Sequence, residues 1–136
     1  MISLDAYFRN KFHSDAQEAE AVILLARVHA LLDEARGAGS YTDMIDPDTG
    51  TQISGSKGGS GDGGFRLPEA QTGAALSAHK EAKAVDIFDP EESLDTWITD
   101  AILSRHGLFR EHPSKTIGWT HMQTKSPKSG KRTFQP

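Results

Sequence analysis

The sequence predicts a small α+β domain, in which helices flank a small antiparallel sheet. Three observations support this fold class. Residues 15–36 carry an apolar stripe at helical spacing, residues 83–88 are rich in β-prone side chains, and a second helical pattern with two short β-prone segments follows. The chain has 136 residues. That length suits one domain with one modest core, so we expect a single domain over residues 1–136.

The helix over residues 15–36 is predicted from its apolar face. Ser14 or Asp15 stands where a side chain caps a helix start, and Gly37 stands where a helix commonly ends. The apolar positions follow i, i+3, i+4, i+7 spacing, which places them on one buried face. They are Ala21, Leu24, Leu25, Val28, Leu31, Leu32 and Ala35.

Residues 37–76 are predicted to form loops. An Asp-Pro-Asp-Thr-Gly turn signature occupies residues 46–50, and the segment 54–64 contains six glycines. Ordering such a backbone costs much entropy and buries few side chains, so we expect a mobile or substrate-facing loop. A phosphate-binding loop fits poorly, because no Gly-Lys-Ser/Thr sequence leads into an apolar helix.

The rest of the chain predicts a strand, a helix and two more strands. The first strand covers residues 83–88. Asp89 as N-cap and Pro90 at the first helical position then open one helix, which Gly107 closes. The two later strands are expected at residues 108–111 and 117–123.

Composition excludes several classes of protein. Hydrophobic residues make up 36 % and charged residues 25 % of the chain, as in a soluble globular protein, and we expect a monomer with no membrane insertion. The chain has no cysteine, so a metal would have to be held by histidine and carboxylate side chains. The net charge of −4 argues against nucleic-acid binding by the domain as a whole.

The two ends of the chain carry their own signals. The basic tail at residues 125–136 is interpreted either as a solvated end or as a contact for an anionic polymer. The N-terminus lacks the basic and apolar segments of a secretory signal, so we expect a cytoplasmic product.

His79, Asp86 and His121 form the candidate metal site. His79 and Asp86 lie seven residues apart, and His121 lies in the middle of the last predicted strand. Two imidazoles and one carboxylate would leave a fourth position open on a tetrahedral zinc ion, which is the mark of a catalytic site. On spacing alone, however, core or surface roles are more common for such residues than metal binding.

A resemblance changes that weighting. The chain contains Ser-x-His-x-x-x-x-Ala-Val-Asp at residues 77–86, Gly-Leu-x-x-Glu-His-Pro at 107–113, Gly-Trp-x-His-x-Gln-Thr at 118–124 and Ser-Gly-x-Arg-x-Phe-x-Pro at 129–136. With Ser54 and Gly55 in the loop, these motifs resemble the zinc D-Ala-D-Ala carboxypeptidase family of the hedgehog/DD-peptidase fold, and its small phage-borne members above all.

The resemblance implies a function. It identifies His79, Asp86 and His121 as zinc ligands, and it implies hydrolysis of an amide bond next to a D-amino acid in peptidoglycan stem peptides, as carboxypeptidase or endopeptidase. The setting would be a phage endolysin or a wall enzyme carried on the virion. Such enzymes also need a general base, which is usually a carboxylate.

Three departures from the family pattern leave residue roles open. Gly118 stands where many members carry the catalytic acid, so Glu111 is the candidate base, with a structural or salt-bridging role as the alternative. The substrate carboxylate would be bound by Arg66 or Lys57, and we favour Arg66. Ala82 replaces a usual glycine, which is mild if its φ angle is negative.

Two further residues complete the expected site. Ser77 would contact a ligand or orient the loop, and Trp119 would pack beside the site or contact substrate. Two competing hypotheses remain. One is a zinc-binding domain without catalysis that binds cell wall or serves in virion structure, and the other is an interaction module without metal.

Overall fold

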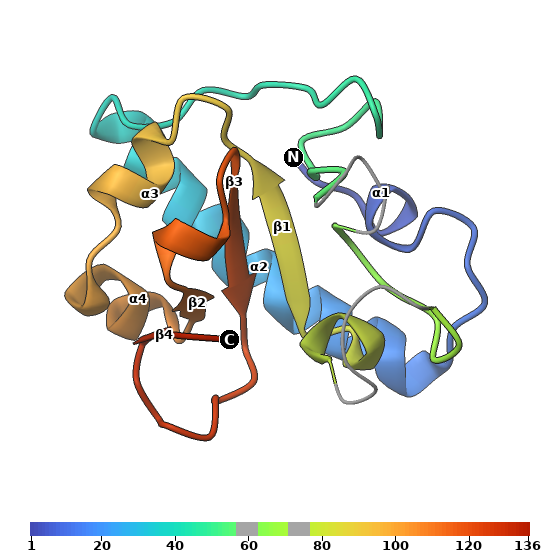
Figure 1. Ribbon diagram of the computed structural model, residues 1–136. Coiled ribbons are helices and arrows are strands. Elements are labelled where there is room, and N and C mark those ends of the chain that lie inside the picture. The colour runs from blue at the N-terminus through green and yellow to red at the C-terminus, as the bar shows by residue number, and fades with distance from the viewer. Residues whose placement is uncertain (57–62, 71–76) are drawn as a thin grey trace.

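The computed structural model describes residues 1–56, 63–70 and 77–136 (Figure 1). Within these ranges the chain forms four α-helices, two short 3-10 helices and a four-stranded mixed sheet, which confirms the α+β class. The 3-10 helices are η2, Ala78–Glu81, and η3, Pro113–Lys115. None of the helices in the described ranges combines the length and apolar character needed to cross a membrane.

Helix α2, Asp15–Gly37, confirms the predicted long helix and its buried face. Ser14 caps its start in a reciprocal capping box with Gln17, an arrangement that is worth about 1 kcal/mol in typical helices. All seven predicted apolar positions are buried. The predicted stop is two residues too early, because Gly39, at φ +74°, and not Gly37, takes the left-handed conformation that ends the helix.

The sheet has the strand order β1-β3-β2-β4. Strands β1, Ala84–Phe88, β3, Trp119–Gln123, and β2, Phe109–Glu111, pair antiparallel. Strand β4, Thr133–Phe134, pairs parallel with β2. The expectation of a purely antiparallel sheet is therefore wrong at this edge. Strand β4 lies beside Glu111, and with two residues it is too short to show an alternating pattern in the sequence.

The sheet has two chemically different faces because side chains alternate along each strand. Val85, Ile87 and Met122 belong to the hydrophobic core with the apolar residues of α2, which passes behind β1 and β3 (Figure 1). The alternate positions, including Asp86 and His121, point to the opposite face. Helix α2 thus supports the sheet from one side and leaves the other side for polar side chains.

The single helix predicted after the first strand is two helices. Helix α3 covers Ser93–Trp97 and helix α4 covers Asp100–His106, and the extended Thr99 between them accepts the N–H of Ile102 to cap α4. Asp89 is not the N-cap that the sequence predicts, but its carboxylate accepts the N–H groups of Leu94 and Asp95 at the start of α3. Gly107 ends α4 in the left-handed conformation, as predicted.

Helix α1, Leu4–Phe8, is too short to have been predicted from periodicity. Tertiary contacts hold it in place. The Tyr7 hydroxyl donates to the carbonyl of Ala84 at 2.8 Å, and the carbonyl of Tyr7 accepts the N–H of Phe65 at 3.0 Å. Helix α1 therefore ties the segment 63–66 to the start of β1, close to the candidate site.

Candidate metal centre

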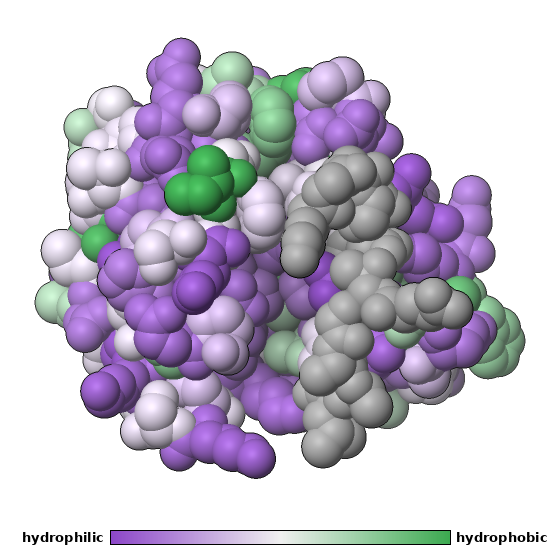
Figure 2. Space-filling model, in the orientation of Figure 1, coloured by the Kyte–Doolittle hydropathy of each residue, from purple (hydrophilic) through white to green (hydrophobic). Residues whose placement is uncertain are grey.

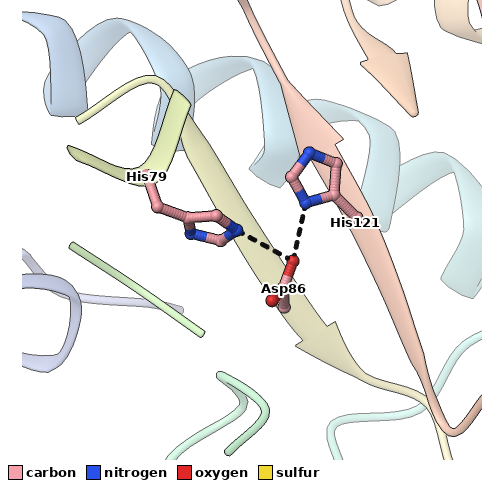
Figure 3. A group of neighbouring side chains, drawn as sticks. All are labelled: His79, Asp86 and His121. Carbon is pink, nitrogen blue, oxygen red and sulfur yellow. Dashed lines mark hydrogen bonds and ion pairs between the residues drawn. The ribbon is translucent and has the colours of Figure 1, made fainter. Parts of the chain in front are cut away.

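His79, Asp86 and His121 come together in the structure (Figure 3). His79 lies in η2, Asp86 on β1 and His121 on β3, where Asp86 and His121 are direct cross-strand partners. One ligand atom from each residue lies within 4.8 Å of the others, and all three residues are buried. The predicted grouping is therefore present.

His79 is oriented by its surroundings. Its Nδ1 lies 2.9 Å from the carbonyl oxygen of Gly64, which is an acceptor only. Nδ1 must therefore carry the proton, which leaves Nε2 to face Asp86 Oδ1 at 3.3 Å. Ser77 caps η2 by accepting the N–H of His79 at 3.3 Å. Ser77 thus holds the segment that carries His79, and a contact between Ser77 and a substrate stays a prediction.

Two glycines let the backbone approach the site. A Cβ atom on Gly64 would lie 2.4 Å from the carbonyl oxygen of Tyr7, and one on Gly63 would lie 1.9 Å from that of Ser54. These separations exclude any side chain without a backbone shift. The glycine run that the sequence predicts as a loop thus serves, at its described end, to place an acceptor beside His79. Residues 57–62 lie outside the described part.

Ala82 departs from what the sequence favours. The residue ends η2 in the left-handed conformation at φ +59°, not at the negative φ under which the loss of glycine would be mild. A non-glycine residue pays about 1–2 kcal/mol for this conformation. The alanine methyl is fully buried in the core, and its packing offsets part of that cost.

Asp86 is held through both carboxylate oxygens. Oδ1 faces the two imidazoles, at 2.8 Å from Nδ1 of His121 and 3.3 Å from Nε2 of His79. Oδ2 accepts a hydrogen bond from the Ser56 hydroxyl and lies 3.6 Å from Nη2 of Arg66. The carboxylate is therefore fixed with one oxygen directed to the histidines.

His121 is held by contacts at each ring nitrogen. Nε2 lies 2.7 Å from Oε1 of Gln123, and Nδ1 faces Asp86. Glu111, at the end of β2, places Oε1 3.9 Å from the same Nδ1 and keeps its side chain 25 % exposed. The predicted acid is thus next to the site and open to solvent.

The charge of Asp86 dominates the electrostatics of the candidate site. Burial works to raise the pKa of Asp86, but His79 and His121 outweigh it and hold this pKa well below the usual range. Burial lowers the pKa of His79. Burial also opposes protonation of His121, but Asp86 and Glu111 raise the pKa of His121 to about 9. The carboxylate therefore attracts one positive charge, which is either a proton on His121 or a bound cation.

The donor set fits a metal ion. His79 Nε2, Asp86 Oδ1 and His121 Nδ1 converge, while the outer nitrogen of each imidazole has an acceptor of its own. Hydrogen-bonded outer nitrogens are typical of metal-bound histidines because they fix the ring and its tautomer. A buried group of this composition could therefore hold a metal ion.

The remaining predicted residues have mixed outcomes. Arg66 is buried and reaches the site through Asp86. Trp119 opens β3 and lies half-buried at an alternate position to His121, on the same face of the sheet. Lys57 falls outside the described residues. Gly118 lies in the turn before β3 at φ +91°, where it has no side chain to offer.

Sequence reasoning missed three contributors. Gln123 lies two residues after His121 on the same strand, so both side chains are on one face of the sheet. The His-x-Gln pattern within a predicted strand could have indicated this contact. Phe134 stands in the Ser-Gly-x-Arg-x-Phe-x-Pro motif at residues 129–136, but nothing in that motif placed it beside His121, and Ser56 had no signal. The Phe134 ring lies edge-on to the His121 ring with centroids 6.3 Å apart, because β4 brings the tail beside β2.

The face of the molecule in Figure 2 is mostly hydrophilic and is hollowed near its centre, over β1 and β3.

Comparisons of the chain with protein-family models, with curated proteins and with solved structures found no match.

Proposed function

We propose that the protein is a zinc-dependent peptidase of the D-Ala-D-Ala carboxypeptidase type, which hydrolyses an amide bond next to a D-amino acid in cell-wall stem peptides. One observation carries this proposal. Three convergent ligand atoms, from His79, Asp86 and His121, lie beside a partly exposed carboxylate on the neighbouring strand, Glu111. Ligands and a nearby acid–base group are the minimum that metal-assisted hydrolysis requires.

Zinc is the proposed metal because two imidazoles and one carboxylate suit it and because the chain has no thiolates. Three protein ligands leave one coordination position for water or substrate. Zinc held by these three ligands would supply Lewis acidity toward a carbonyl oxygen and toward water. The outer hydrogen bonds of both histidines support this assignment, since they prepare the rings for binding.

Glu111 is the proposed general base and acid. Its carboxylate lies 3.9 Å from a ligand nitrogen and is not itself one of the three ligands. Partial exposure lets it exchange protons with solvent and with a substrate in the hollow. Glu111 thus takes the role that Gly118 cannot fill, from the adjacent strand.

Arg66 is the proposed binding group for a substrate carboxylate. Its guanidinium is buried next to Asp86, and a planar fork of donors matches a carboxylate in two-point geometry. A cation beside a site of this kind favours peptides that end in a free carboxylate. Peptidoglycan stem peptides ending in D-Ala have this feature. A phage-encoded enzyme that reaches the wall at lysis or on the virion is the proposed setting.

A hydrolysis assay tests the proposal. The substrates are a peptide ending in D-Ala-D-Ala and purified peptidoglycan, with the zinc-loaded wild type, Glu111→Gln and the control Glu91→Gln. Glu91 is exposed. We expect release of D-Ala or wall fragments by the wild type and the control, and a rate about 10²- to 10⁴-fold lower for Glu111→Gln.

The outcomes separate the competing functions. Hydrolysis that Glu111→Gln leaves unchanged would remove Glu111 from the reaction. Bound zinc without hydrolysis of either substrate would contradict the peptidase and favour the domain that binds cell wall without catalysis.

A further inference from the structure

Gln123 contacts the candidate metal centre from outside. It lies two residues after His121 on β3, so both side chains point to the same face of the sheet. Both residues are buried, and Oε1 of Gln123 lies 2.7 Å from Nε2 of His121. Gln123 is not one of the three candidate ligands, and it contacts the imidazole of His121.

The amide of Gln123 has only one workable orientation. Its Nε2 donates to the carbonyl oxygen of Lys125 at 2.7 Å. Turning the amide over would place two acceptors, Oε1 and the Lys125 carbonyl, against each other. The Lys125 carbonyl therefore fixes Oε1 toward His121, and a carbonyl-type oxygen only accepts hydrogen bonds.

The consequence for His121 follows from this orientation. An imidazole nitrogen that faces a pure acceptor must carry a proton, so Nε2 is an N–H of the ring. Nδ1 faces Asp86 Oδ1, which is also an acceptor, at 2.8 Å, so it carries a proton as long as no cation is bound. A cation held by Asp86 would replace that proton, because Oε1 of Gln123 retains the proton on Nε2. We infer that Gln123 is a positioning residue that selects Nδ1 of His121 as the metal-binding nitrogen. This inference rests on the metal site proposed above.

The two histidines are fixed by different means. His79 is oriented by a backbone carbonyl, that of Gly64, which substitution cannot delete. His121 is oriented by a side chain, which can be replaced. Without an acceptor at residue 123, the His121 ring can carry its proton on either nitrogen, so part of the population presents the wrong atom to the metal. Loss of an outer partner of this kind typically lowers metal affinity about 10- to 100-fold.

Three variants isolate the effect. Gln123→Met has similar size but no acceptor, Gln123→Glu keeps the acceptor toward His121 but loses the donor to Lys125, and Gln52→Met is the control. Gln52 is equally buried, with 6 % exposure for each glutamine, but its amide bonds Tyr41 away from the ligands. Zinc affinity is measured by competition with a chelator of known affinity, and unfolding of the metal-free forms is followed in parallel.

We expect Gln123→Met to bind zinc about 10- to 100-fold more weakly than the wild type. Gln123→Glu and Gln52→Met should stay within a few-fold. In the zinc-loaded wild type, ¹H–¹⁵N correlation spectra of His121 should show a metal-bound Nδ1 and a protonated Nε2. The Glu variant separates positioning from simple structural support, because support through Lys125 is lost equally in the Met and Glu variants.

Wild-type zinc affinity in Gln123→Met would overturn the inference, and so would equal losses of affinity in the Met and Glu variants. A metal bound through Nε2 of His121 would do so as well. Zinc binding without peptidase activity would defeat the proposed function and leave this inference standing, whereas no zinc in the wild type would defeat both.

Discussion

Asp86 and His121 face each other across β1 and β3, and Oδ1 of Asp86 lies 2.8 Å from Nδ1 of His121. The strand register produces this contact, since a slip by one residue would turn either side chain into the core. Alternating side chains of the same strands, Val85 and Met122, are fully buried against the hydrophobic core. Burial of the core face thus fixes the geometry of the site face.

Asp86→Asn should abolish tight metal binding. The change removes a charged ligand atom but keeps the size of the side chain, and Ser56 can still contact the amide. We expect zinc affinity to fall by more than about 100-fold, the upper end of the effect of losing an outer partner. Chelator competition measures the loss. An affinity equal to that of the wild type would exclude Asp86 as a ligand.

Gly64→Ala should damage the site through the backbone. The added methyl would lie 2.4 Å from the Tyr7 carbonyl oxygen, so the backbone of Gly64 or of Tyr7 must shift, and a shift at Gly64 would displace the carbonyl that orients His79. We expect lower thermal stability and weaker zinc binding. The matched control is Gly37→Ala at the helical end of α2, where no atom lies within 4 Å of the new methyl. It should be neutral or raise stability by up to about 1 kcal/mol. Equal behaviour of the two variants would contradict the close approach.

Asp95→Asn should change how stability depends on pH. Burial raises the pKa of Asp95 to about 6, and Arg110 and Thr116 oppose that shift only in part. Asp89 adds a second carboxylate near Asp95 and raises its pKa further. The folded protein therefore binds a proton that an unfolded chain, with a pKa near 3.9, releases. This contribution to stability is complete below pH 4 and is lost as the pH rises through about 6.

The difference in unfolding free energy between wild type and Asp95→Asn isolates this group from the histidines. As the pH falls from 7 to 4, the unfolding free energy of the wild type should rise relative to that of Asp95→Asn by up to about 3 kcal/mol. Urea unfolding at a series of pH values measures it. If the difference in unfolding free energy stays constant, or if the variant gains stability relative to the wild type as the pH falls, then Arg110 compensates the burial of the Asp95 carboxylate and its pKa is not raised.

Arg66→Lys tests the proposed carboxylate contact. A lysine retains the charge beside Asp86 but loses the two-point fork. On a peptide with a free C-terminal carboxylate, we expect kcat/KM to fall about 10- to 100-fold, the value of a charge-assisted hydrogen bond. On the same peptide with a C-terminal amide, wild type and variant should be alike. Equal losses on both peptides would assign Arg66 to support of Asp86 alone.

The long helix and the central strands could be predicted because their signals are local. Helix α2 has a full apolar stripe and a capping box, and β1 and β3 have alternating bulky residues. The convergence of His79, Asp86 and His121 could not be predicted from spacing. It depends on the register of β1 with β3 and on the turn at Ala82. The residue types made these three residues a candidate site, and the family resemblance strengthened that expectation.

Other features were unpredictable for physical reasons. Helix α1 and strand β4 have five and two residues and exist through tertiary contacts. The break between α3 and α4 depends on Thr99, whose hydroxyl caps the second helix although the apolar pattern continues through it. Hydrogen bonds to backbone carbonyls, such as that of His79 to Gly64, leave no trace in the sequence.

Metal content per chain tests the central claim most directly. The proteins are wild type, His121→Ala and the control His106→Gln, all purified without a histidine tag and reconstituted with zinc. His106 faces Glu34 and has no part in the centre. Elemental analysis should find about one zinc ion per chain in the wild type and the control and none in His121→Ala, as three-ligand sites require all their ligands. No zinc in the wild type, or equal zinc in His121→Ala, would contradict the account.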